Sequence, residues 1–372
     1  MTGSRPTTAP DFLLSRAHGS VRTQGAAETF SDPDPAIAAL RAKKVPMIVG
    51  AIPFERGKPV ALTVPKKIIR EDGPLEPPAY YRQGPKAQLF AQLASLDPSP
   101  EEHLERVAAA IRTMANTDLK KVVLARAVDI AFNPPVDPLL LGARLIDRSY
   151  NRDGFIADLS PAGEQYHGVI FVGSSPEVLI KKQGSTISAF PLAGTAAREK
   201  NPAADATAAQ QLLRSAKDLH EHSYVVEHLR EILSPLCANL DIPAKPQLMR
   251  TNELWHLATP IVGTLRDSSL TALELAIAVH PTPAICGTPT DMAEGLILTA
   301  ESDRGFYAGA VGWADDNGDG EFMVAIRCAA VAADGSTARA WAGGGLVAES
   351  DPYAELAETT AKLRTIMNTL GL

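Results

Sequence analysis

The candidate strands of this chain are not separated by regularly spaced helices. Runs such as 121–126 and 168–173 are rich in β-branched residues and are typical of strands. Residues 305–313 and 321–330 flank a segment of Asp, Asn and Gly, which is typical of an antiparallel hairpin. A doubly wound sheet requires strands that alternate with helices, so the pattern favours an α+β fold with large antiparallel sheets.

Several helices and loops have local signals of their own. Ser99-Pro100-Glu101-Glu102 is a capping box with proline at the first helical position. A run without helix breakers predicts a helix within 205–233, and the periodicity predicts a last helix over about 352–370. The breaker-rich stretches 31–36 and 70–85 predict surface loops of one domain.

The composition is that of an ordinary globular chain. Of the 372 residues, 45% are hydrophobic and 21% charged, and the net charge of −7 argues against binding to a nucleic-acid backbone. Three widely spaced cysteines predict reduced thiols. No apolar run reaches about 18 residues, so we expect no membrane span. Residues 1–10 lack the apolar core of a signal peptide and predict a disordered arm, and we therefore expect a cytoplasmic protein.

Two segments look like metal sites, but their spacing argues against that. His220 and His222 are two residues apart on a predicted helix, so they project about 200° from each other and cannot share one zinc ion. The segment that begins at Asp315 resembles a calcium loop, but its twelfth position is Ile326 instead of a glutamate. We predict a polar helix face for the first and a hairpin turn for the second.

Acidic residues on the last predicted helix leave two alternatives open. Glu355, Glu358 and Lys362 lie on one side of that helix, which is equally typical of an exposed face with a Glu358–Lys362 ion pair. If this face meets the helix that contains Glu221, two or three carboxylates converge. Hard oxygen ligands of this kind suit Mg²⁺.

Two charged residues at strand ends could supply acid–base chemistry. Lys121 begins a strand whose neighbouring positions are small, and burial there would make it a usable base in place of an ordinary solvated strand end. Glu177 begins another strand, and a carboxyl in an apolar cleft can stay protonated as an acid. The glycines at 343–345 predict a bulge or tight bend, with close approach of the backbone to an anion as the alternative.

Nine segments, in order over residues 99–372, resemble the chorismate-utilising enzymes: isochorismate synthases, salicylate synthases and the large subunits of anthranilate and aminodeoxychorismate synthases. The first hundred residues match loosely, chiefly at 50–54. The matching segments are 121–126 (KVVLAR), 173–177 (GSSPE), 191–195 (PLAGT), 217–222 (KDLHEH), 254–259 (LWHLAT), 280–284 (HPTPA), 325–328 (AIRC), 342–345 (AGGG) and 355–358 (ELAE).

The resemblance implies large antiparallel sheets packed together and flanked by helices. Residues 99–372 would form the chorismate-binding catalytic region, and residues 1–98 the N-terminal part of the same domain. Isochorismate synthases of siderophore and menaquinone pathways are the most similar members. By their likeness, Lys121 would activate a water that attacks C2 of chorismate, and Glu177 would protonate the departing C4 hydroxyl.

The resemblance also implies the ligands of the metal and of the substrate. Mg²⁺ would be held by Glu221 and Glu358, with Glu355 adjacent. Arg327 and the backbone of Gly343 would bind the enolpyruvyl carboxylate. The substrate positions that remain are Gly194, Thr195 and Lys362 at the carboxylate near the metal and Ala284 against the ring.

Lys121 separates members of the family by their nucleophile. Relatives that use ammonia have an uncharged residue at this position, so a lysine implies water and no glutaminase subunit. We expect a monomer. A salicylate synthase, which goes on to eliminate pyruvate, stays open as an alternative, although the sequence near Ala284 is more similar to the isochorismate synthases. A non-catalytic chorismate-binding regulator is disfavoured by the pair of Lys121 and Glu177.

Overall fold

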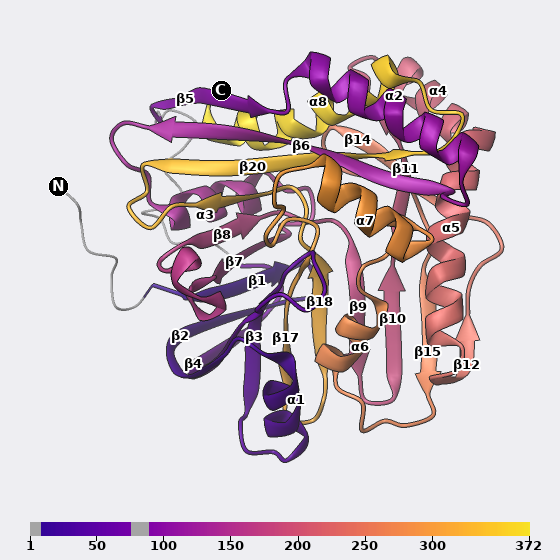
Figure 1. Cartoon of the computed structure of the whole chain (residues 1–372). Coiled ribbons are helices and arrows are strands. Elements are labelled where there is room, and N and C mark those ends of the chain that lie inside the picture. The colour runs from indigo at the N-terminus through magenta and orange to yellow at the C-terminus, as the bar shows by residue number, and fades with distance from the viewer. Residues whose placement is uncertain (1–8, 76–88) are drawn as a thin grey trace.

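A computed structural model describes residues 9–75 and 89–372 of the chain (Figure 1). The strands are β1 (Phe12–Arg16), β2 (Gly19–Phe30), β3 (Met47–Ile52), β4 (Ala61–Asp72), β5 (Ala91–Asp97), β6 (Lys121–Phe132), β7 (Gly154–Asp158), β8 (Ile170–Gly173), β9 (Val178–Gln183), β10 (Thr186–Phe190), β11 (Leu192–Ala197), β12 (Cys237–Asp241), β13 (Gln247–Arg250), β14 (Leu254–Ala258), β15 (Ile261–Leu265), β16 (Gly287–Thr288), β17 (Ala310–Asp315), β18 (Gly320–Val324), β19 (Cys328–Val331) and β20 (Thr337–Leu346). The helices are α1 (Pro33–Arg41), α2 (Pro100–Asn116), α3 (Pro138–Arg148), α4 (Pro202–Leu212), α5 (Ala216–Leu233), α6 (Ala272–Val279), α7 (Thr290–Ala300) and α8 (Pro352–Leu370), with 3₁₀ turns η1 (Ser160–Ala162) and η2 (Glu164–Tyr166).

Most of these strands form one continuous hydrogen-bonded sheet. From β5 it passes through β6, β20, β19, β8, β7, β1, β2, β4, β3, β17, β18, β9, β10 and β15 to β12, and each of these pairings is antiparallel. A second, three-stranded sheet of β11, β14 and β13 is also antiparallel. The predicted α+β fold with large antiparallel sheets is therefore confirmed.

The first strands lie inside the long sheet. β1, β2, β4 and β3 stand between β7 and β17. The loop expected at 31–36 is wrong, because Asp32 and Pro33 begin helix α1: the Asp32 side chain accepts a hydrogen bond from the Asp34 N–H, and proline fits the first turn. Residues 70–72 belong to β4, whereas 76–85 and the arm at 1–8 lie outside the described residues.

The helix predicted within 205–233 is two helices. α4 ends at Leu212 and α5 starts at Ala216, where the Ser215 side chain accepts a hydrogen bond from the Asp218 N–H as a new N-cap. The helix start at Ser99, the last helix and the hairpin of β17 and β18 are confirmed.

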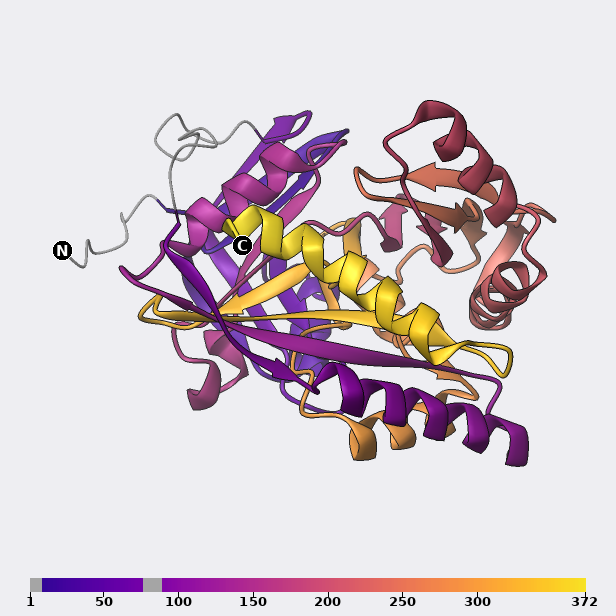
Figure 2. The ribbon, with the colours of Figure 1, turned by 90° about the horizontal axis from the view of Figure 1, so that it is seen from above.

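Helices α5 and α8 lie next to the strands that carry most of the candidate site residues. α8 lies along β20 and packs against α2 and α3, and α5 packs on β11 (Figure 2). β6 and β20 pair over their whole common length, with Val122 opposite Leu346. The start of β6, the glycines of β20, and the first turns of α5 and α8 therefore come to one place. Within residues 9–75 and 89–372, no helix is both long and apolar enough to cross a membrane.

Candidate active site

One cavity collects nearly all the residues that the sequence singled out. Its walls come from the segment before β9, from β11, β14 and β20, and from α5 and α8, and the space amounts to ≈ 680 Å³ with the open mouth included. We call it the site cavity. Of the predicted site residues it is lined by Glu177, Gly194, Thr195, Glu221, Ala284, Arg327, Gly343, Glu358 and Lys362.

Lys121 lies directly behind the wall of this cavity. It is the first residue of β6, and its side chain is completely buried. The Nζ atom is 3.0 Å from Oε1 of Glu221, which lines the cavity from α5. The pairing fits the expectation that a buried ammonium requires a carboxylate partner. Of the two alternatives for Lys121, the solvated strand end is therefore wrong.

Gly345 leaves the space in which Lys121 and Glu221 meet. A Cβ atom at position 345 would be 2.1 Å from Glu221 Oε1 and 3.2 Å from Lys121 Cε. Gly343 is confined in the same way, because a Cβ there would be 2.9 Å from both Tyr307 Oη and Val123 Cγ1. Both glycines keep regular register with β6, so the predicted bulge is wrong. A side chain at either position would displace these neighbours, so the glycines leave them where they are.

Glu177 is buried at the start of β9, with 3% of its surface exposed. The Leu192 N–H donates a hydrogen bond of 3.3 Å to its Oε1. Burial raises the pKa of Glu177 to about 7, against the opposing effects of that hydrogen bond and of Lys121 and Lys362. Its carboxyl group can therefore hold a proton near neutral pH, as the sequence suggested for an acid in an apolar cleft.

Three carboxylates gather between α5 and α8, and each is paired with a lysine. Besides the Lys121–Glu221 pair, Lys217 donates to Glu355 Oε1 at 2.7 Å, and Lys362 Nζ is 2.6 Å from Glu358 Oε1. Glu355 is buried, and its second oxygen, Oε2, has no hydrogen-bond partner.

The charges of this cluster act on one another. Burial opposes the charge of Lys217, but Glu355, Glu221 and Glu358 outweigh burial and raise the pKa of its ammonium. Burial and the neighbouring Glu358 raise the pKa of Glu355. The last helix does meet the helix of Glu221, so the carboxylates converge. The Glu358–Lys362 ion pair is also present, but the alternative of an exposed face is wrong, because Glu355 is buried.

The donor set of this cluster suits a hard divalent cation. The groups are carboxylates, and one buried oxygen, Glu355 Oε2, is left over. As they stand, however, no three His, Cys, Asp or Glu side chains in the described part of the chain converge as ligands of one ion. A metal ion bound here would have to compete with the lysine that pairs with each carboxylate.

Two cationic side chains, Arg327 and Lys362, also line the site cavity. Arg327 is buried, in a left-handed backbone conformation with φ of 52°, and its Nη2 is 3.5 Å from Nε2 of His256. Lys362 Nζ donates to the Gly343 carbonyl at 2.8 Å. Gly194, with φ of 78°, lies at a β-bulge of β11. Guanidinium and ammonium groups beside carboxylates in one cavity suit an anionic ligand that bridges to a cation.

The sequence did not single out His256, Tyr307 and Trp341, which also line the site cavity. His256 is buried, and burial together with Arg327 holds the pKa of its imidazole well below the usual range. Since Arg327 can only donate, Nε2 of the neutral ring accepts and Nδ1 donates to Thr195 Oγ1 at 3.3 Å. The rings of Tyr307 and Trp341 are stacked, with their centroids 5.6 Å apart. His256 stood within a matching segment, but only the β11–β14 register places it beside Thr195.

The model of the chorismate binding enzymes matches residues 74–371. The chain belongs to this family. The expected family and the expectation of an enzyme are thereby confirmed.

Three relatives within the family have names that specify an activity. The chain is 45% identical over 369 residues to a protein of Mycobacterium tuberculosis named "Putative isochorismate synthase MenF", covering 98% of this chain and 96% of that one. It is 41% identical to isochorismate synthase DhbC of Bacillus subtilis, over 88% of this chain and 81% of that one. Among solved structures, MenF, the menaquinone-specific isochorismate synthase of Escherichia coli, matches with a TM-score of 0.84 at 25% identity, covering 98% of this chain and 89% of that one.

Proposed function

We propose that this protein is an isochorismate synthase that converts chorismate reversibly into isochorismate. Relatives that match nearly the whole chain are named for this activity. The observation that carries the proposal is the combination of a buried Lys121 paired with Glu221 and a Glu177 with a pKa of about 7 beside the same cavity. One group serves as a base and the other as an acid, which an exchange of hydroxyl groups needs.

The two groups would act at the two reacting carbons. Lys121, as a neutral amine, takes a proton from a water molecule as the water oxygen bonds to C2, and becomes an ammonium. The ring double bonds shift, the C4–O bond breaks, and Glu177 gives its proton to the departing hydroxyl, which leaves as water. In the reverse direction Glu177 is the base and Lys121 the acid.

The remaining residues would hold the two carboxylates of the substrate. Arg327 and the Gly343 backbone would bind the enolpyruvyl carboxylate, and Gly194, Thr195 and Lys362 the ring carboxylate, with Ala284 against the ring. Glu221, Glu358 and Glu355 would hold Mg²⁺. When bound, the ion supplies positive charge that orients and screens the ring carboxylate. These residues all line the site cavity except Glu355, which pairs with Lys217. The assignment of the metal rests on the hard oxygen donors.

The use of water also bears on partners and pathway. A lysine as the buried base favours water over ammonia, so we propose that the chain acts without a glutaminase subunit. Its product would enter siderophore or menaquinone synthesis, as names such as vibriobactin-specific and menaquinone-specific indicate for relatives.

The test is product identification with purified protein, chorismate and Mg²⁺. We expect isochorismate to accumulate, and chorismate to form when isochorismate is supplied. Lys121→Gln should abolish both directions, whereas Lys120→Gln, at an exposed neighbour, should keep wild-type turnover. Stoichiometric salicylate and pyruvate would overturn the proposal in favour of a salicylate synthase. Absence of any turnover would favour a regulator.

A further inference from the structure

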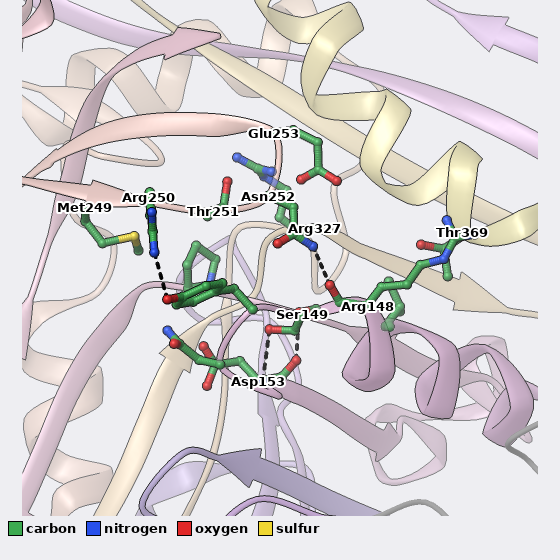
Figure 3. A pocket seen from close by; sticks show the side chains of 15 residues that line it. Arg148, Ser149, Asp153, Met249, Arg250, Thr251, Asn252, Glu253, Arg327 and Thr369 are labelled. Carbon is green, nitrogen blue, oxygen red and sulfur yellow. Dashed lines mark hydrogen bonds between the residues drawn. The ribbon is translucent and has the colours of Figure 1, made fainter. Parts of the chain in front are cut away.

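Figure 3 shows the side chains that line a second cavity. Its space is ≈ 620 Å³, again with the open mouth included. One wall is the end of α3 and the loop after it, from Arg148 to Asp153, and the opposite wall is the turn from Arg250 to Glu253 between β13 and β14. We call it the side cavity. Pro176 and Arg327 line both the side cavity and the site cavity, so the two adjoin at these residues.

Contacts between the two walls are few and lie toward the solvent. Arg250 Nη2 donates to Tyr150 Oη at 2.8 Å, and its guanidinium lies 4.9 Å from the centre of that ring. Tyr150 is 62% exposed, so this contact is at the outer side. The Asn252 side chain donates to the Arg148 carbonyl and joins the turn to the end of α3 (Figure 3).

The side cavity presents unpaired positive charge. In the part of the chain that the structure describes, neither Arg148 nor Arg250 forms an ion pair with a carboxylate. Two acidic residues, Asp153 and Glu253, are on the walls. Asp153 forms an ion pair with Arg16, whose Nη1 lies 2.9 Å from Oδ1. An exposed pair of guanidiniums without carboxylate partners attracts anions, even in a chain with a net charge of −7.

Arg327 connects this charge with the site cavity. Its carbonyl accepts a hydrogen bond of 3.0 Å from the Ser174 N–H, which lines the side cavity, while its guanidinium lies beside His256, which lines the site cavity. The left-handed backbone at this residue fixes that position between the two spaces. Guanidiniums thus follow one another from the solvent inward, in the order Arg250 and Arg148, then Arg327.

We propose that the side cavity is the access route of the substrate, where Arg148 and Arg250 capture a small dicarboxylate and pass it to Arg327. This rests on the proposed function, which supplies the dianionic substrate. Arg148 and Arg250 then act on association and leave the reaction itself unchanged. Both arginines are exposed, so their attraction for the substrate acts through solvent. Salt therefore screens this attraction beyond a Debye length of about 10 Å at 0.1 M.

The test measures the rate constant of chorismate association by stopped flow, from the change in tryptophan emission, to which Trp341 in the site cavity contributes. Arg148→Glu and Arg250→Glu should each slow association about tenfold at low ionic strength, with the difference shrinking to within about twofold at 0.5 M salt. Arg148→Gln and Arg250→Gln remove the positive charge without reversing it, so each should slow association less than the corresponding glutamate variant. The matched control is Arg112→Glu, an exposed arginine on α2 that lines neither cavity and changes the net charge equally.

Two results decide the proposal. If the Arg148 and Arg250 variants associate at the same rate as Arg112→Glu, or if their loss is independent of salt, the access route is wrong. If the loss lies in kcat and association is unchanged, these arginines affect the reaction, and the proposal is also wrong. Failure of the proposed function would look different, since the wild-type chain would then form no isochorismate whatever the association rates.

Discussion

Glu177→Gln provides a test of the site that does not depend on substrate. In the folded protein, burial raises the pKa of this carboxyl from 4.5 to about 7. In the unfolded chain the carboxyl loses its proton at the lower value. Between the two values the folded state therefore binds more protons than the unfolded state, and stability falls as pH rises.

The magnitude follows from the size of the shift. About 2.5 pH units, at roughly 1.4 kcal/mol each, amount to ~3 kcal/mol of the free energy of unfolding. This contribution is fully present below about pH 4.5, is lost progressively up to about pH 7, and is constant above that. Glutamine has no proton to lose, so Glu177→Gln lacks this dependence. Relative to wild type, the variant should gain ~3 kcal/mol between pH 4.5 and pH 8.

The measurement is urea unfolding of both proteins at half-unit steps from pH 4.5 to pH 8, followed by circular dichroism. Effects of all other groups cancel in the difference between the two curves. Glu105→Gln, at an exposed position of α2, is the matched control and should give a difference that does not change with pH. A flat difference for Glu177→Gln, within about 0.5 kcal/mol, would refute the argument that burial controls this carboxyl.

Three further outcomes are expected. Chelation of divalent cations should abolish turnover and added Mg²⁺ should restore it, and full activity of metal-free protein would remove magnesium from the proposal. Gly345→Ala places a Cβ atom 2.1 Å from Glu221 Oε1, so turnover should fall about 100-fold with the fold retained, whereas Gly295→Ala, whose added methyl meets nothing within 4 Å, should be neutral; equal activities would contradict the clearance argument. Glu177→Gln should block formation of isochorismate and of chorismate alike in a product assay, and loss in one direction alone would exclude a shared acid–base role.

Local signals in the sequence predicted local structure well. The cap at Ser99, the last helix and the hairpin of β17 and β18 all came from neighbouring residues, and all are confirmed. The failures were also local ambiguities. Asp and Pro at 31–36 suit a loop and a helix start equally, and Ser215 served as an N-cap inside a run that read as one helix.

The sequence by itself determined the family and the residue types of the site, because matching segments that follow one another in a fixed order can be recognised without any knowledge of contacts. Burial was a different matter. Whether Lys121 was solvated or buried depended on β20 and α5, which contribute residues a hundred or more positions away. The clearance at Gly345, the partners of His256 and the shared wall at Arg327 likewise arise where distant strands and helices meet. Only the tertiary structure decides such contacts, since electrostatics and packing depend on distances in space, and spacing along the chain does not give these distances.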